Sequence, residues 1–340
     1  MQKLFIISNE SIFNNEGNFF CDNIDLKSTP EGLNNKFEVN IIGRKSKEAR
    51  FHKINIKNLN TYSNIVSYLV GIFKSFSNKN SKYLIFSISP FTFFACILIG
   101  IFKKKQIIYL RSDGYSEYKA ILGFFGPIIY HLMFFIASKI SSLISCREYI
   151  LRSKKGAVIF PSQISPQWLL NHTEIDIKQT KLLYVGRIKK EKGIFSLLEI
   201  IKDSKSDLQL SIVGAEKNFS NQIVQNNVYI HEIENNEKNL IKFYDENNIF
   251  VLPSYTEGHP MVLLEALSRL RPVIIFKDIE HVIGDKKGIF ISERNSASFF
   301  KVITHIKENY RSIQQEIKEN KLPTKEQFLK SFSKLISEMS

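Results

Sequence analysis

Short apolar runs alternate along the chain with longer stretches of helical periodicity. The runs are rich in Ile, Leu, Val and Phe, which is typical of strands buried on both faces of a parallel sheet. Strands are predicted at 4–8, 37–42, 82–87, 106–110, 142–145, 157–160, 181–185, 208–213, 227–230, 249–252 and 273–276. Helices are predicted at 61–76, from Pro90, at 194–202, up to about 245, from Pro260, and from 297 until Pro323, before a last amphipathic segment at 326–336. This order predicts an α/β fold of doubly wound layers.

A proline-rich segment divides this pattern into two series. Residues 161–166 contain two prolines and polar side chains, and a second run of alternating strands and helices follows them. A chain of 340 residues is long for one core and suits two domains. We therefore predict a first domain at 1–162 and a second domain that begins at 163.

Two glutamates mark the end of the strand predicted at 249–252. The segment 251–272 reads VLPSYTEGHPMVLLEALSRLRP, in which a polar turn precedes a helix that begins at Pro260. Glu257 lies in the turn, and Glu265 lies in the middle of the otherwise apolar helix. Carboxylates are rarely buried without a partner. The pair therefore predicts a site for a ligand rich in hydroxyl groups or positive charge.

A basic loop follows the strand predicted at 181–185. Gly186 ends the strand, Arg187 follows it, and Lys192 lies just before the next helix. Cations beside a helix N-terminus form an anion site. A planar guanidinium and a mobile ammonium together suit a diphosphate. A solvated basic turn without a ligand is the alternative interpretation.

These groups are expected to meet, because ligands of open α/β sheets bind at the carboxyl ends of the strands. The backbone N–H groups at the start of the helix after Gly258 also favour an anion. Pro260 is the exception, because proline has no backbone N–H. His259 lies in the same turn and is equally well interpreted as a polar loop residue. Cations for phosphate and carboxylates for hydroxyl groups together match a nucleotide-diphosphate sugar.

The spacing of these motifs resembles the nucleotide-binding half of the GT-B glycosyltransferases, in particular the retaining family 4, also called glycosyltransferases group 1. VGR-x4-KG is followed about 65 residues later by PS-x2-EG-x6-E, and the resemblance covers residues 181–291. It implies a GT-B fold, in which two Rossmann-like domains face each other across a cleft. It also implies that the last helix returns to the first domain, so we expect domains at 1–162 and 163–312, and crossing helices at 313–340.

The resemblance further implies a role for each matched residue. Arg187 and Lys192 would bind the donor diphosphate and stabilise charge as it leaves. Glu257 would contact the donor sugar, and Glu265 would hold the ribose hydroxyls. The other donor-side positions are Gly186, Gly214, Ile233, Gly258, His259, Pro260 and Met261, with the nucleobase near Gly214 and residues 231–233.

Three positions depart from the family pattern. Leu270-Arg271-Pro272 replaces the usual glycine before Pro-Val, and the polar loop expected after the first strand keeps one glycine, Gly17. Asp113 follows Arg111 and Ser112 where the family often has a histidine. Asp113 could polarise an acceptor hydroxyl, or it could cap the following turn. Gly17 and Asp113 are the acceptor-side candidates.

The net charge of +14 and the pI near 9.4 indicate an anionic partner, although AT-rich codon usage explains abundant lysine equally well. The apolar segments 91–102 and 120–137 are too short or too interrupted to span a membrane, and we expect them to be core or surface-dipping helices. Lysines at 103–105, 119 and 139 flank them and predict peripheral contact with an anionic membrane.

Three dispersed cysteines and no signal peptide predict a cytoplasmic location, at the inner face of the membrane.

The predicted function is transfer of a sugar, with retention, from a UDP- or GDP-linked donor to a glycan acceptor, lipid-linked, in cell-surface polysaccharide synthesis. The chain has no Asp-x-Asp pair and no histidines at ligand spacing, so we expect no metal and no cofactor. One alternative is a GT-B-fold epimerase or phosphorylase. Another is a basic protein that binds nucleic acid or membrane without catalysis. No nucleic-acid-binding signature is present, and we expect no nucleic acid partner.

Overall fold

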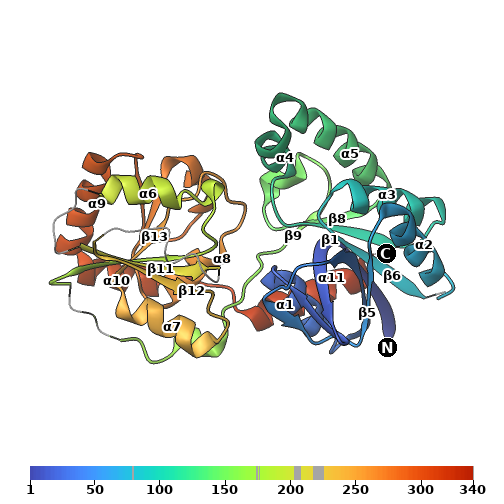
Figure 1. Ribbon diagram of the computed structural model, residues 1–340, viewed down its shortest axis with the longest axis horizontal. Helices are drawn as coiled ribbons and strands as arrows, with labels where there is room; N and C mark the ends of the chain where they lie inside the picture. Colours follow the sequence, from blue (N-terminus) through green and yellow to red (C-terminus); the bar gives the residue numbers. More distant parts are fainter. Residues whose placement is uncertain (79, 174, 176, 203–207, 217–225, 340) are drawn as a thin grey trace. The chain divides into compact units, whose positions relative to one another are not determined.

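The computed structural model describes residues 1–340 except 79, 174, 176, 203–207, 217–225 and 340. The chain forms two compact units (Figure 1). The first contains Met1–Phe160 and Glu326–Ser340, and the second contains Pro161–Lys325. Each unit has a largely parallel sheet with helices on both faces. The division after Phe160 falls at the proline-rich segment.

The sheet of the first unit is organised around one long strand, β1 (Gln2–Asn15). This strand pairs in parallel with β3 and β6, and antiparallel with β2. The strand order is β4-β2-β1-β6-β7-β8-β9, with β3 beside β1 and β5 beside β3. The other strands are β2 (Asn18–Cys21), β3 (Phe37–Ser46), β4 (His52–Ile54), β5 (Asn58–Tyr62), β6 (Ser81–Phe86), β7 (Gln106–Leu110), β8 (Ser142–Ser145) and β9 (Ala157–Val158). All residues of β6 and β7 are buried, as expected for central parallel strands.

Helices cover both faces of this sheet. The apolar side chains of α1 (Ile24–Leu33) and α11 (Lys325–Glu338) share one core with the sheet. Those of α2 (Ile65–Ser75), α3 (Pro90–Ile101) and α5 (Gly126–Ile140) form a second core on the other face. The remaining helix, α4 (Gly114–Leu122), packs on α5.

The last helix is fixed to the first unit by a buried lysine. The Nζ of Lys82 donates hydrogen bonds to the carbonyl oxygens of Ile336 at 2.6 Å and Ser337 at 2.7 Å. Carbonyls at a helix C-terminus lack intrahelical hydrogen-bond partners and carry partial negative charge. The ammonium group therefore both donates hydrogen bonds to them and stabilises this charge. Gly32 of α1 lies so close to Leu329 that a Cβ would lie 2.3 Å from its Cδ1. The helix is therefore an integral part of this unit.

The polar loop expected after the first strand is a β-hairpin. Strand β1 continues to Asn15 and pairs with β2, with Asn15 opposite Asn18. The two residues between them, Glu16 and Gly17, have φ values of 50° and 85°. Two consecutive left-handed residues match the twist of a tight hairpin turn. Gly17 is an exposed turn residue, and nothing lies within 4 Å of a Cβ placed on it. The expectation of a loop was therefore wrong, because the hairpin depends on backbone pairing and not on an apolar pattern.

The second unit is a single parallel sheet in the order β12-β11-β10-β13-β14-β15. Its strands are β10 (Thr180–Val185), β11 (Leu208–Ala215), β12 (Val228–Glu232), β13 (Ile249–Leu252), β14 (Val273–Phe276) and β15 (Ile289–Ser292). Its helices are α6 (Ile194–Ile201), α7 (Glu237–Glu246), α8 (Met261–Ser268), α9 (Ser296–Glu308) and α10 (Tyr310–Lys318). Figure 1 shows α6 and α7 on opposite faces of this sheet. Because the strands are parallel, the loops that follow them share one edge.

The structure corrects the extent of the crossing segment expected at 313–340. Helix α10 belongs to the second unit, since Ile313 and Ile317 lie in its core and the hydroxyl of Tyr310 donates a 2.8 Å hydrogen bond to the carbonyl of Asn248. Of the segment expected to cross, only Glu326–Ser340 belongs to the first unit. The elements α1, α4, β4, β5 and β15 were also missed, and all of them mix polar and apolar residues.

Candidate functional site

Two glycines bring the ends of β10 and β11 into backbone contact. The amide of Gly186 donates a 2.9 Å hydrogen bond to the carbonyl of Val213. A Cβ on Gly214, whose φ is 126°, would lie 2.3 Å from the carbonyl oxygen of Gly186. Only glycine allows this approach. Two of the three predicted donor-side glycines therefore lie together at the carboxyl edge of the sheet.

The basic loop is held against the turn that follows β13. Gly193 is the N-cap of α6 and lies in the left-handed region, with a φ of 68°. A Cβ there would lie 1.8 Å from the carbonyl oxygen of Pro253. The amide of Tyr255 donates a 3.0 Å hydrogen bond to the carbonyl of Glu191. These backbone contacts join the two sequence motifs.

The contact between the motifs centres on one carboxylate oxygen. The Nζ of Lys192 lies 2.7 Å from Oε1 of Glu257, and the hydroxyl of Ser254 lies 2.7 Å from the same oxygen. The backbone carbonyl of Glu257 accepts a 2.7 Å hydrogen bond from Nε2 of His281. The side chains of Lys192 and Glu257 are 26% and 12% exposed, so the pair is accessible at one side. The structure thus brings together the cation and the carboxylate that were predicted from separate motifs.

Arg187 lies at the same edge and is exposed to solvent. Its backbone carbonyl accepts a 2.8 Å hydrogen bond from the buried hydroxyl of Tyr184. Burial raises the pKa of Tyr184 above its ordinary value, so this hydroxyl stays a donor. The contact fixes the backbone of the loop, while the guanidinium has no ion pair within 4.0 Å among the described residues. An anionic ligand would therefore meet an unpaired cation there.

Glu265 is half-buried on α8, and its partner was not predicted. The hydroxyl of the buried Tyr244 donates a 2.8 Å hydrogen bond to Oε2 of Glu265. Burial raises the pKa of Glu265 to about 7, against the opposing effect of this hydrogen bond. The carboxyl group therefore changes its charge near neutral pH.

The other donor-side candidates lie around this edge. Ile233 follows β12, and its amide donates a 3.2 Å hydrogen bond to the carbonyl of Ala215. Gly258, Pro260 and Met261 lie in the turn and at the start of α8. Nε2 of His259 lies 2.8 Å from the carbonyl oxygen of Pro161, so this histidine has a structural contact in the second unit.

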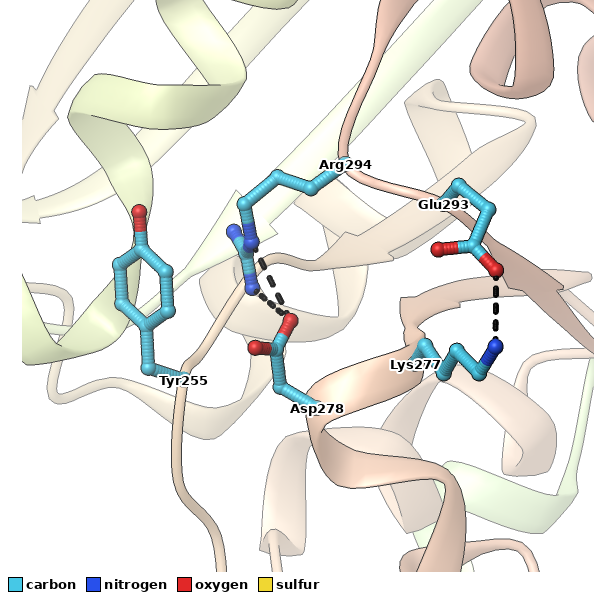
Figure 2. A pocket seen from close by; sticks show the side chains of 5 residues that line it. All are labelled: Tyr255, Lys277, Asp278, Glu293 and Arg294. Atoms are coloured by element: carbon cyan, nitrogen blue, oxygen red, sulfur yellow. Dashed lines mark hydrogen bonds and ion pairs between the residues drawn. The ribbon is translucent and has the colours of Figure 1, made fainter.

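An arginine that the sequence reasoning missed secures the turn before Glu257. Arg294 stacks on Tyr255, with its guanidinium carbon 3.9 Å from the ring centre, and pairs with Asp278 at 2.7 Å (Figure 2). It also donates hydrogen bonds to the carbonyls of Pro253 at 2.9 Å and Ser254 at 3.3 Å. The cavity beside it has a volume of about 360 Å³ and is lined by Tyr255, Lys277, Asp278, Glu293 and Arg294. Arg294 follows β15, so detection of that strand would have placed it at this edge.

The two acceptor-side candidates lie in the first unit. Asp113 is the N-cap of α4, and its carboxylate accepts hydrogen bonds from the amide of Tyr115 at 3.3 Å and the hydroxyl of Ser116 at 2.7 Å. It also pairs with Arg152 at 3.0 Å. The structure therefore shows the capping role that was the alternative for Asp113. Gly17 serves the hairpin turn described above, and its acceptor role stays a prediction.

No cluster of three or more His, Cys, Asp or Glu side chains with the arrangement of a metal site occurs within the described part of the chain. The three cysteines, Cys21, Cys96 and Cys146, are buried and free. The expected independence from metals stays a prediction.

Comparison with known proteins gives the same assignment as the motifs. Residues 170–322 match the family Glycosyl transferases group 1. The capsular polysaccharide biosynthesis glycosyltransferase CapM of Staphylococcus aureus is 31% identical over 144 residues, which are 36% of this chain and 37% of that protein. Two of the curated relatives are matched over only 33% and 37% of their length.

Two solved structures extend the likeness over nearly the whole chain. WaaG, a glycosyltransferase involved in lipopolysaccharide biosynthesis, has a TM-score of 0.66 at 14% identity and covers 98% of this chain and 100% of that chain. Anabaena Alr3699/HepE in complex with UDP and glucose has a TM-score of 0.70 at 12% identity, with 99% and 100% coverage. The predicted GT-B fold is confirmed. Residues 170–322 therefore form a glycosyl transferases group 1 domain, within a chain that has the GT-B fold.

Proposed function

We propose that the protein is a glycosyltransferase that moves a sugar from a nucleotide-diphosphate sugar to a hydroxyl group of a glycan, with retention at the anomeric carbon. The observation that carries this proposal is the pair of Lys192 and Glu257. It lies at the carboxyl edge of a parallel sheet, within the residues that match the group 1 family. A cation and a carboxylate side by side suit a ligand that carries phosphate next to hydroxyl groups.

The proposed reaction breaks the bond between the anomeric carbon and the diphosphate and forms a bond to the acceptor oxygen on the same face. The acceptor proton passes to the departing diphosphate oxygen. Arg187 and Lys192 stabilise the negative charge that develops on the diphosphate. Glu257, held by Ser254, accepts hydrogen bonds from the sugar, and Glu265 accepts them from the ribose hydroxyls. In this proposal, neither the breaking of the bond to the diphosphate nor the formation of the bond to the acceptor needs a bound metal.

The printed names of relatives and structural neighbours support a proposal for the donor and the acceptor. We propose a UDP- or GDP-linked donor, since one structural neighbour was solved with UDP and glucose. We propose a lipid-linked glycan acceptor in cell-surface polysaccharide synthesis, since relatives are named for capsular polysaccharide and lipopolysaccharide. A cytoplasmic location at the inner face of the membrane belongs to the same proposal.

A thermal-shift screen with UDP, GDP, ADP and a panel of nucleotide sugars tests donor binding, because a ligand of the folded state raises the melting temperature. Transfer is then followed as nucleotide release with EDTA present, and the anomeric configuration of the product is read by NMR. Glu257→Ala should abolish transfer, whereas Glu191→Ala is the matched control, because Glu191 is exposed and contributes its backbone carbonyl to the turn. If no nucleotide sugar bound, the proposed donor would be wrong. If activity were lost in EDTA and restored by Mn²⁺, the proposed independence from metal would be wrong.

A further inference from the structure

Helices α4 and α5 form a hairpin with an apolar tip. The segment Gly114–Ile140 is long and apolar enough to cross a membrane, by length and composition alone. It is nevertheless not one helix. Gly123 ends α4 with φ 62° and ψ −139°, a short turn of 3₁₀ helix follows at Gly123–Phe125, and α5 runs for 15 residues. A span needs about 20 residues, so neither helix reaches across a bilayer.

The hairpin is closely packed. A Cβ on Gly114 would lie 2.1 Å from the ring of Tyr130, and one on Gly126 would lie 1.9 Å from the carbonyl oxygen of Tyr118. Glycine at both positions lets the two helices approach each other. The hairpin therefore presents its tip as a defined structure.

Apolar side chains are exposed at the tip and along the outer side of α5. Phe124 is 80% exposed and Phe125 is 67% exposed, and Ile121, Ile128, Ile129 and Leu132 are exposed beside them. The inner side of α5 carries the buried Tyr130 and Phe134. A surface helix that is apolar on both sides is unusual for a protein surrounded by water. This patch is consistent with an apolar environment on its outer side.

Positive charge gathers where the apolar surface ends. Residues 120–138 contain no Asp, Glu, Lys or Arg, whereas residues 103–155 contain ten Lys and Arg against three Asp and Glu, a net charge of +7. The ammonium groups of Lys139 and Lys154 lie 4.0 and 5.5 Å from the ring centre of Phe135. Lysines that pack on aromatic rings with their charge at the edge of an apolar patch are suited to a membrane interface.

A basic cavity lies beside the hairpin. It has a volume of about 690 Å³, and its lining includes Arg152, Lys154 and Lys155 together with Glu148. The guanidinium carbon of Arg152 lies 4.8 Å from the ring centre of Tyr115 in α4. The cavity therefore adjoins the base of the hairpin and offers cations to phosphate groups.

We propose that the α4–α5 hairpin inserts its apolar tip and outer side into a membrane leaflet that contains anionic phospholipid, while Lys139, Lys154 and the basic cavity contact the headgroups. Amphipathic elements of this kind are buried about 5–10 Å into the boundary between headgroups and acyl chains. The inference rests on the first unit alone and does not depend on the proposed sugar transfer, so either can fail without the other.

Vesicle flotation of the full-length protein tests the proposal. Vesicles of phosphatidylcholine with about 30% phosphatidylglycerol should carry the protein at low salt, and pure phosphatidylcholine vesicles should carry much less. The double variant Phe124→Glu/Phe125→Glu should lower partitioning by at least tenfold, because two exposed rings lose their apolar contact with lipid. Tyr229→Glu is the matched control, since Tyr229 is an exposed aromatic residue of β12 in the other unit.

The basic rim is tested separately. Lys139→Gln and Lys154→Gln should each lower binding to the anionic vesicles about fivefold, with no change on phosphatidylcholine. Nucleotide binding and the melting temperature of the tip variant should match the wild type, because both phenylalanines are exposed. Wild-type binding by the tip variant would overturn the proposal. So would a stable dimer that the tip variant converts to monomers, because the patch would then be an interface between copies of the chain.

Discussion

Nζ of Lys192 donates a 2.7 Å hydrogen bond to Oε1 of Glu257, the same oxygen that the hydroxyl of Ser254 contacts. The two groups that we assign to the donor diphosphate and the donor sugar therefore neutralise each other in the free protein. A diphosphate that binds Lys192 has to compete with this carboxylate. In the proposed reaction, a donor diphosphate at Lys192 would therefore release Glu257 from the pair.

The first prediction concerns this competition. Glu257→Gln should bind UDP as tightly as the wild type or up to about fivefold more tightly, because a partly exposed ion pair of about 0.2–1 kcal/mol no longer restrains the lysine. Transfer should nevertheless fall at least about a hundredfold, as for loss of a group that contacts the reacting sugar. Calorimetric titration with UDP and initial rates measure the two effects. Lys192→Ala is the counterpart and should lose UDP affinity, and a large loss of UDP affinity in Glu257→Gln would refute the competition.

The second prediction is a pH dependence from Glu265. The folded carboxyl has a pKa of about 7, above its ordinary 4.5, so the folded state binds more protons than the unfolded state between these values. The free energy of unfolding should therefore decrease as the pH rises from about 4.5 to 7 and then level off, by about 1–3 kcal/mol. Denaturant melts at several pH values measure this slope. Glu265→Gln should lack this contribution. If the free energy of unfolding changed with pH in the same way in the variant and the wild type, the prediction would be disproved.

The same carboxyl should affect nucleotide binding. Ribose hydroxyls donate to the ionised form, so UDP should bind more tightly as the pH rises from 6 to 8. In Glu265→Gln this pH dependence should be reduced.

The third prediction concerns Leu270, which replaces the glycine of the family pattern. Its φ is 59°, in the left-handed region that disfavours side chains by about 1–2 kcal/mol. Its side chain is also buried, so removal loses packing. Leu270→Gly and Leu270→Ala should therefore both be less stable than the wild type, with the glycine variant about 1 kcal/mol more stable than the alanine variant. Leu267 lies within α8 and is the control position. There the free energy of unfolding of Leu267→Ala should be about 1 kcal/mol higher than that of Leu267→Gly, because glycine is the poorer helix former.

The fourth prediction concerns Arg294. Its planar guanidinium contacts two carbonyls and Asp278 at once, which an ammonium cannot reproduce. Arg294→Lys should lower the free energy of unfolding by about 2 kcal/mol and reduce transfer, because the turn before Glu257 loses its support. Lys277→Gln breaks an exposed ion pair in the same cavity and should change stability by less than about 1 kcal/mol. Equal effects of the two substitutions in thermal melts would contradict this role of Arg294.

The fifth prediction separates the two roles considered for Asp113. An N-cap asparagine accepts the same amide hydrogen bond, so Asp113→Asn should keep most of the stability and most of the transfer activity. Asp113→Ala should lower the free energy of unfolding by about 1–2 kcal/mol, because α4 loses its cap. If Asp113→Asn folds normally but loses transfer, the carboxylate has a role in the reaction beyond capping.

Much of the second unit could be predicted from local patterns. Its central strands are uninterrupted apolar runs, and glycine, arginine and lysine at the end of β10 lie at a fixed spacing from the glutamates after β13. Parallel strands place their carboxyl ends at one edge, so the meeting of these motifs followed from the strand assignment alone. The first unit was harder, because β1 and β2 carry polar residues and pair through backbone hydrogen bonds, which leave no apolar pattern.

The sequence by itself determined the α/β class, the central strands, and the meeting of its two donor-side motifs at the carboxyl edge, because side-chain periodicity and motif spacing are local properties of the chain. Only the tertiary structure decided their partners. The contacts between Lys192 and Glu257, Tyr244 and Glu265, Arg294 and Pro253, and Asp113 and Arg152 each join residues that are 21 to 65 positions apart. Such contacts depend on how whole elements pack, and that packing fixes whether a charged side chain is free, paired or used as a cap.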